Sequence, residues 1–593
     1  MKKANLLYGA LAMLAFTACS DDKASRPDEV LNDGTESYIT IRLMDANTIN
    51  ARANDFDNGN NDTDYKESLV NTITIAFFDA NKNFITYSTD ATPLGFGPTE
   101  STGGSLETKK EIKVKLTLRD DQALPAYAIA FANPIEAAPS LSNVASTQSS
   151  TRATFGNKNG STQYFAMNNS VYFNDKGEMQ VAVPVSTKNF YKGDNDTKAE
   201  AVDFYVERIA GKVVLKGNGD NGSSLSNKAS EMTVNDGTED GSKKYIVFVP
   251  EKWGLNAVEK TTYLMKNFQQ SFSTLETNLQ WATGTIWNDE ANKRSYWAHS
   301  CTWNENSFPD VSDDVTTDAT FKLKYVTYKE IATNGTAFGQ PAYTLENTKK
   351  RDAYNKNSAL VSAVVIGHYE IRDDQNTPVA PETGKALFYR RSGNLYTPAG
   401  YMSLMASLQQ MIGTVTGTES SLSFTALEAA ELEKYVEVYH PTKNSLGGKV
   451  KENLVTIKVK ESADLSDLYI RVAENDYKKF GESGKTKADL NNYLLSVCGL
   501  TEAYTEGKAF FNVPIEHLGQ KIENNPSAGF YGIVRNHTYE INITAWAEAA
   551  FGTGIFDETK PIVPDTSTDE YNFKANFNVN AWRIVNKNVT LGQ

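Results

Sequence analysis

The sequence predicts a mainly β protein with two β-sandwich domains of Greek-key type and a few helices in insertions. Three observations support this prediction. Short apolar segments alternate with polar residues at period two, polar stretches rich in Gly, Asn and Asp separate these segments, and helical patterns are few. Because 593 residues exceed the length that one ordinary core accommodates, we expect more than one domain.

The first predicted strand is 37–44, in which Ile39, Ile41 and Leu43 alternate with polar neighbours, the pattern of a half-buried strand. Residues 69–88 contain two apolar runs around the polar turn DANKN, which predicts a β-hairpin. The strand-like pattern continues at 111–118, 126–134, 170–173, 179–185 and 202–217.

Helical patterns occur only in the second half of the chain, at 401–412, 425–439 and 489–500. The polar, Gly-rich stretch 217–242 separates the strands of the first part from the rest of the chain. We therefore expect the boundary between the two domains in this stretch.

Charge and motif content exclude several functional classes. With 59 Lys and Arg against 73 Asp and Glu, the formal net charge is −14 and no basic cluster is present, which argues against nucleic acid and anionic membrane surfaces as partners. The five histidines lack the spacing of a metal site. GNGDNG (217–222) follows a strand-like segment but precedes no apolar helix, so it fails as a nucleotide-binding loop. GESGKT (481–486) lacks both the leading glycine and the buried strand of a P-loop. No catalytic residue, cofactor or metal is predicted.

The N-terminus has the pattern of an export signal: MKK precedes the short apolar run LLYGALAMLAF, and TAC comes next, ending at Cys19. This pattern resembles the bacterial lipobox, which implies that Cys19 is acylated, with fatty acids such as palmitate, and becomes the mature N-terminus. The alternative is a plain secretory signal with an incidental cysteine. The two remaining cysteines, Cys301 and Cys498, either form one disulfide or remain two unpaired buried thiols.

Several segments, in order along the chain, together resemble the Mfa-type fimbrillins, subunits of the type V pili of anaerobic Gram-negative bacteria. They are the lipobox at Cys19, RLMDANTINARAND, AYAIAFANP, VERIAGKVVL, YTLENT, GKAFFNVPIEHL, GFYGIVRNHTYEINITAW and FNVNAWRIVNKNVTL. The region 350–500 is the least recognisable. The resemblance implies transthyretin-like sandwich domains, no enzymatic activity, and a place in a surface fimbria, or at the outer membrane for the lipidated precursor.

The resemblance also implies a route of assembly. In this family an Arg-specific surface protease cuts behind the first strand, this strand leaves its groove, and the C-terminal segment of a neighbouring subunit takes its place by strand addition. In this chain the cut falls between Arg52 and Ala53. The departing plug strand comprises Tyr38, Ile39, Ile41 and Leu43. The donor residues, within 571–591, are Tyr571, Phe573, Ala575, Phe577, Val579 and Trp582.

The organisation implied by this route has four parts. They are a signal peptide at 1–18, a lipidated propeptide carrying the first strand at 19–52, an N-terminal sandwich at 53–215 and a C-terminal sandwich with the donor strands at 216–593. The implied partners are copies of the same chain in a head-to-tail polymer, other fimbrial subunits, the protease, and host or bacterial surface receptors for adhesion and biofilm formation.

Other interpretations stay open from the sequence alone. Residues 38–43 can be a permanent edge strand and residues 571–591 a permanent final strand. The cut can fall at Arg26 or Arg42 instead. The chain can also be a cell-surface glycan-binding lipoprotein, or a hydrolase, whose 7 Trp and 29 Tyr stack on sugars. Neither a shaft, a tip nor an anchor role follows from the sequence.

Overall fold

The structure is a computed structural model of the 593-residue chain. It describes residues 31, 33–45, 65–66, 70, 72–88, 111–133, 141–159, 162–169, 172–173, 179–192, 199–217, 234–235, 244–267, 298–310, 313, 315, 320–373, 375–379, 386–418, 421–441, 450–451, 453–517, 530–546, 551–564 and 573–581. Most of the described elements are strands, and most of their pairings are antiparallel, which confirms the predicted mainly β class.

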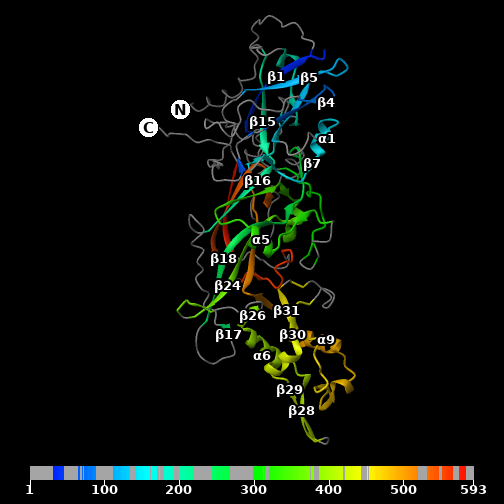
Figure 1. Ribbon diagram of the computed structural model, residues 1–593, viewed down its shortest axis with the longest axis vertical. Helices are drawn as coiled ribbons and strands as arrows, with labels where there is room; N and C mark the ends of the chain where they lie inside the picture. Colours follow the sequence, from blue (N-terminus) through cyan, green and yellow to red (C-terminus); the bar gives the residue numbers. More distant parts are fainter. Residues whose placement is uncertain are drawn as a thin grey trace, which may run out of the picture.

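The molecule is elongated, and its sheets follow one another along the long axis (Figure 1). Strands β1, β4 and β5 lie at one end, β16, β18 and β24 in the middle, and α6, α9, β28 and β29 towards the other end. Three large apolar cores accompany these three regions.

The first region is a nine-stranded sheet around a core of aliphatic and phenylalanine side chains. β3 and β4 pair as the hairpin predicted at 69–88. The strands of this sheet are β1 (Glu36–Asp45), β3 (Ile73–Phe78), β4 (Phe84–Tyr87), β5 (Glu111–Thr117), β6 (Tyr127–Ala132), β10 (Met167–Asn169), β13 (Val183–Pro184), β14 (Phe190–Tyr191) and β15 (Val202–Arg208).

The middle region contains two sheets that contribute side chains to one core, among them Leu215, Phe248, Val365 and Ile541. The four-stranded sheet has the order β22 (Pro341–Leu345), β16 (Ala210–Lys216), β37 (His537–Trp546) and β39 (Phe573–Ala581). The other sheet comprises β18 (Tyr245–Asn256), β24 (Ser362–Arg372), β25 (Pro378–Val379), β35 (Lys508–Pro514) and β38 (Thr553–Gly554).

The first and middle regions share one arrangement of three strands. β1 pairs antiparallel with β5 and parallel with β15, and β16 pairs antiparallel with β22 and parallel with β37. The chain passes from the first arrangement to the second at the buried Ile209, between β15 and β16. The strand that ends one region therefore leads without a loop into the strand that begins the next.

The third region combines two sheets with α6 (Pro398–Leu408), α7 (Ala429–Tyr435) and α9 (Lys487–Cys498). In α9, Leu490, Leu494 and Cys498 recur every four residues and are buried on one face. Its sheets comprise β17 (Val234–Asn235), β26 (Ala386–Arg391), β27 (Asn394–Tyr396), β30 (Val436–Tyr439), β31 (Leu454–Val459) and β34 (Thr501–Thr505), and β28 (Ile412–Thr418), β29 (Ser421–Ala426), β32 (Tyr469–Ala473) and β33 (Asp476–Lys479).

The helices predicted at 401–412 and 489–500 are confirmed as α6 and α9, but the helix predicted at 425–439 is too long. Only Ala429–Tyr435 is helical, and Val436–Tyr439 form β30, which pairs with β31. The β-branched Val436 and Val438 favour a strand, and their alternation with Glu437 overrides the helical pattern that precedes them. The GESGKT stretch lies ahead of α9, where Thr486 is the N-cap.

The remaining described elements are short. They are β2 (Tyr65–Lys66), α1 (Val144–Ser149), β7 (Thr151–Arg152), β8 (Gly156–Asn159), β9 (Thr162–Phe165), β11 (Tyr172–Phe173), β12 (Met179–Gln180), η1 (Thr187–Asn189), β19 (Val258–Glu259), β20 (Thr262–Tyr263), β21 (Leu323–Lys324), α5 (Tyr328–Asn334), β23 (Asn347–Thr348), η2 (Arg351–Asn355), η3 (Asn357–Ala359), η4 (Phe480–Glu482) and β36 (Gly532–Ile533).

Candidate functional site

β1 lies inside the first sheet. Its residues Glu36–Arg42 pair with β5 on one side. On the other side, Tyr38 and Ile39 pair with β14, and Ile41–Asp45 pair in parallel with β15. The interpretation of residues 38–43 as an edge strand is therefore wrong, because later strands of the chain enclose this strand on both sides.

The two faces of β1 differ as its sequence predicts. Ile39, Ile41 and Leu43 are at most 1% exposed and belong to the first core. Burial of aliphatic side chains of this size stabilises by roughly 1.5–3 kcal/mol each. On the opposite face Arg42 forms an ion pair with Asp203.

Tyr38 also lies on this polar face, where its ring stacks on Tyr191 with centroids 6.0 Å apart. The Nζ of Lys113 lies 4.4 Å from the centroid of the Tyr38 ring. Of the four predicted plug residues, three therefore face the core, and Tyr38 packs on the outer surface of the sheet.

The neighbours of β1 would form a groove without it. Leu116 of β5 and Phe190 and Phe204 of the opposite strands are buried in the same core as Ile41. Removal of β1 would uncover these apolar side chains and two strand edges with unpaired backbone groups. Such a groove accepts an extended segment with alternating apolar side chains.

The other predicted site residues are only partly described. Cys19, Arg52, Ala53, Tyr571 and Trp582 lie outside the described residues. Phe573, Ala575, Phe577 and Val579 lie in β39, which pairs antiparallel with β37 of the same chain, from His537 opposite Ala581 to Trp546 opposite Phe573. In the order of described strands β39 is the end of its sheet.

Cys301 and Cys498 are free thiols in this structure, so the disulfide that the sequence left open is not formed. Cys498 is buried at the end of α9, and Cys301 is half-buried in a turn of the middle region. Burial raises the pKa of each thiol to about 11, which keeps both protonated and unreactive at neutral pH.

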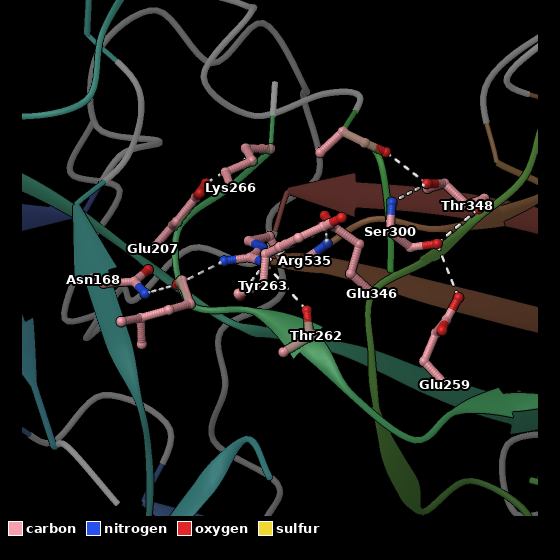
Figure 2. Close-up of polar contacts among 12 residues, drawn as sticks. Asn168, Glu207, Glu259, Thr262, Tyr263, Lys266, Ser300, Glu346, Thr348 and Arg535 are labelled. Carbon is pink, nitrogen blue, oxygen red and sulfur yellow. Dashed lines mark hydrogen bonds and ion pairs between the residues drawn. The ribbon is translucent and has the colours of Figure 1, made fainter. Parts of the chain in front are cut away.

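A cluster of buried charges lies where the first region meets the middle region (Figure 2). Lys266 pairs with Glu207 of β15, with an N–O distance of 3.3 Å, and both side chains are fully buried. Arg535, which precedes β37, pairs with Glu346 at 3.4 Å and is also fully buried. Arg535 further donates hydrogen bonds to the carbonyl oxygens of Tyr263 and Leu264 and to the hydroxyl of Thr262.

A third pair joins this cluster. The Nζ of Lys349 lies 2.9 Å from Oε1 of Glu259, and both side chains are at most 2% exposed. The free energy needed to remove two charges from water often exceeds the gain from their mutual attraction. Buried ion pairs therefore seldom make a fold more stable than apolar packing would. Their geometry instead defines one arrangement of the segments that they join, and here those segments include β15 and the start of β37.

Sequence reasoning did not identify this cluster, although the segments VERIAGKVVL, YTLENT and VRNHTYEI contain Glu207, Glu346 and Arg535. The available signal was a charged residue inside a strand-like apolar segment. Such a residue requires a buried partner, but the sequence does not show which segment provides it.

The described strands thus define a mainly β protein whose first strand is enclosed by later strands and whose last described strand ends a sheet. Residues 502–588 match the family model described as major fimbrial subunit protein type IV, fimbrillin, C-terminal. This match is confined to the C-terminal part of the chain, and it agrees with the family that the sequence resemblance indicated.

No curated protein matches the chain. Solved structures found in a structural comparison with this chain include a putative cell adhesion protein from Parabacteroides distasonis (10% identity, 93% of this chain and 98% of that chain covered, TM-score 0.34). Others are the fimbrilin FimA from Porphyromonas gingivalis (10%, 94% and 100%, TM-score 0.34) and the C-terminally truncated tip fimbrial protein Mfa3 from the same species (9%, 92% and 100%, TM-score 0.29). At TM-scores this low, the solved structures support no conclusion beyond the family-model match of residues 502–588.

The described residues contain no group of three or more His, Cys, Asp or Glu side chains placed to hold a metal ion. Among the helices of the described part of the chain, none combines the length and apolar character needed to cross a membrane.

Proposed function

We propose that this chain is a structural subunit of a bacterial surface fimbria of the Mfa type. It is exported as a precursor that is acylated at Cys19, is cut between Arg52 and Ala53, and polymerises by strand exchange. The observation that carries this proposal is the enclosed position of β1, the first described strand, between strands that come 66 or more residues later in the sequence.

The contacts of β1 favour its role as a removable plug. β1 contributes three buried aliphatic side chains to the first core and is bonded to β5 on one side and β14 and β15 on the other. A strand with these contacts leaves only when another strand replaces it, because the apolar groove and two open edges are costly in water. Replacement by an equivalent segment of a second copy restores the same contacts.

The composition of β39 supports its role as the donor. Phe573, Ala575, Phe577 and Val579 alternate with Lys574 and three asparagines, so one face of the strand is apolar throughout. β39 pairs with β37 alone among the described strands, and its departure breaks a single ladder. Each subunit then receives one strand and gives one, which produces an open head-to-tail polymer.

Arg52 suits the protease better than Arg42. The backbone of Arg42 pairs with Glu111 on one side and Asp203 on the other, and its guanidinium forms an ion pair with Asp203. A protease requires an extended segment that is free of such pairing. Arg52 lies between two alanines ahead of a tract of Asn, Asp and Gly, a composition typical of exposed loops.

The experiment that tests the proposal treats the purified precursor with an Arg-specific protease. We expect a new N-terminus at Ala53 and a ladder of oligomers on electrophoresis that heating dissociates. Arg52→Lys keeps the charge but removes the cleavage site, and it should remain a monomer. Arg119→Lys, at an exposed arginine, should polymerise normally. A cleaved chain that begins at Ala53 and stays monomeric would contradict strand exchange.

A further inference from the structure

The hairpin of β28 and β29 lies at the end of the molecule opposite to β1 (Figure 1). β28 pairs with β29 from Gly413 to Thr418, whereas β32 pairs only with Ile412 and Gly413 of β28. Beyond Gly413 the described strands therefore form a two-stranded ribbon. In the order of described strands β29 is the end of its sheet, so every second residue directs its N–H and C=O away from β28, where they can bond to a further strand.

The outer edge of β29 lacks the residues that usually prevent pairing. Charges and prolines normally do so at an exposed edge, but β28 and β29 contain neither. β33, at the other end of the same sheet, contains Asp476, Lys478 and Lys479. Leu422 of β29 is 41% exposed and is one of two large apolar side chains that are exposed in the described part of the chain. These features indicate an edge that another strand covers.

Aromatic contacts hold the hairpin in one orientation. The ring of Phe424 stacks on that of Tyr477 with centroids 5.0 Å apart, and the guanidinium carbon of Arg471 lies 5.0 Å from the centroid of the Phe424 ring. Gly413 makes room for this ring, because a Cβ there would lie 2.5 Å from Phe424 Cζ. The outer edge of β29 thus belongs to a fixed strand, which reduces the entropy lost when a further strand binds.

The sequence of β29 is complementary to itself. If two copies align antiparallel with Ser423 opposite Ser423 of the other copy, Leu422 faces Phe424 and Ser421 faces Thr425. Residues directly opposite each other share one face of a sheet, so apolar side chains meet apolar ones and hydroxyl groups meet hydroxyl groups. Every residue from Ser421 to Thr425 except the half-buried Phe424 is exposed, so this register uses the accessible part of the strand.

From the open uncharged edge, the exposed Leu422 and this self-complementary order, we propose that β29 pairs antiparallel with β29 of a second copy of the chain. The contact goes beyond strand exchange, because it is symmetric and uses neither β1 nor β39. A pairing of five residues buries less than the roughly 1,000 Å² of a stable interface, so one pair is weak. In a polymer formed as proposed above, many such edges act together and join fimbriae side by side.

The test uses the full-length precursor without protease treatment, so its result does not depend on strand exchange. Ser423→Cys places two thiols opposite each other in the proposed register, at the Cα separation of about 4.5–5.5 Å that a disulfide spans. With oxidised glutathione this variant should give a disulfide-linked dimer on non-reducing electrophoresis, above the background of the wild type with its three cysteines. Ser421→Cys and Thr425→Cys should give no such dimer alone. A mixture of these two variants should give one, because the two residues face each other.

Two further variants identify the edge. Leu422→Lys added to Ser423→Cys should abolish the dimer, because a charge at the edge opposes pairing. Thr416→Cys is the matched control, since Thr416 lies directly opposite Ser423 on β28 and is also exposed, and it should give only the background. All of these positions are exposed, so the melting temperature of each variant should stay close to that of the wild type.

The proposal is wrong if Ser423→Cys gives no more dimer than the wild type. It is also wrong if Ser421→Cys or Thr416→Cys alone gives as much dimer as Ser423→Cys, because the contact would then be unspecific or would use the other strand of the hairpin. A peptide with the sequence of residues 571–591 should leave the dimer of Ser423→Cys unchanged. If the peptide prevented this dimer, the edge of β29 would accept the donor segment rather than a second β29, and the proposal would again be wrong.

Discussion

Arg208, the last residue of β15, donates a hydrogen bond from Nη1 to Oδ1 of Asn536 at 2.9 Å, and Asn536 directly precedes β37. The backbone N–H of Asn536 also donates to the carbonyl of Ala210 at 2.7 Å. Both Arg208 and Asn536 are 1% exposed. The strand that pairs with β1 is thus joined through a buried polar contact to the strand that pairs with β39.

The first prediction concerns Asn536, whose φ is +60°. Asn536→Gly removes the contact with Arg208 but tolerates this backbone conformation, whereas Asn536→Ala loses the contact and adds backbone strain. We expect Asn536→Gly to lower the free energy of unfolding by about 1–3 kcal/mol. Asn536→Ala should lower it by about 1 kcal/mol more. Urea denaturation measures both values, and equal losses in the two variants would show that the backbone is not strained there.

The second prediction tests the two faces of β1. Ile41 is fully buried, whereas Thr40 lies on the outer face, where its hydroxyl contacts that of Tyr191. Ile41→Ala should lower the free energy of unfolding of the precursor by about 2–5 kcal/mol, and Ile41→Val by about 0.5–1.5 kcal/mol. Thr40→Ala should cost less than about 1.5 kcal/mol. If Thr40→Ala lowered the free energy of unfolding as much as Ile41→Ala, the assignment of the Ile41 face of β1 to the core would be wrong.

The third prediction concerns pH and Glu207. Burial raises the pKa of Glu207 from 4.5 to about 7, an effect that Glu346 reinforces and that Lys266 and Arg535 oppose. The folded protein therefore holds this proton more tightly than the unfolded chain. The contribution of this tighter proton binding to the free energy of unfolding is fully present below pH 4.5, and it is lost as the pH rises to about 7.

Glu207→Gln cannot titrate, so its stability relative to the wild type should rise between pH 4.5 and pH 7. The expected change is on the order of 3 kcal/mol. Chemical denaturation at several pH values measures the difference, in which the titration of groups that both proteins share cancels. The exposed Glu474 provides the control, and Glu474→Gln should show no such trend. A flat difference for Glu207→Gln would mean that Glu207 stays ionised in the folded protein.

The sequence predicts local features of this fold well, and features that depend on distant partners poorly. The alternation of Ile39, Ile41 and Leu43 identifies the buried face of β1 before any partner is known, because period two is a property of the strand itself. The enclosure of β1 is not predictable in this way, since its neighbours β5, β14 and β15 start between 75 and 166 residues after Glu36.

The buried cluster shows the same limit. Glu207, Glu346 and Arg535 are visible in the sequence as charges within apolar segments, but their ion pairs join residues 59 and 189 positions apart. The prediction of one helix over 425–439 was wrong for a local reason. A helical pattern of Ala, Glu and Leu is followed directly by the strand-forming Val436 and Val438. Periodicity alone did not locate the change.

The last prediction separates strand exchange from other modes of association by means of the two faces of the donor. Phe577 belongs to the apolar series of β39, and its neighbour Asn578 belongs to the polar series. Successive side chains of a strand point to opposite faces, so only the apolar series can enter a groove lined by core side chains. After cleavage with the Arg-specific protease, Phe577→Asp should therefore remain monomeric, because a carboxylate in that groove would be buried without a partner.

Asn578→Asp adds the same charge one position away and should give the same ladder of oligomers as the wild type. Size-exclusion chromatography of the cleaved proteins gives the fraction polymerised, and the melting temperature of each uncleaved precursor shows whether its own fold is intact. If both variants polymerised equally, the alternation of β39 would have no part in assembly, and the donor would have to be sought elsewhere in the chain. If neither polymerised, the charge itself rather than the face would be responsible, and strand exchange through β39 would lose its support.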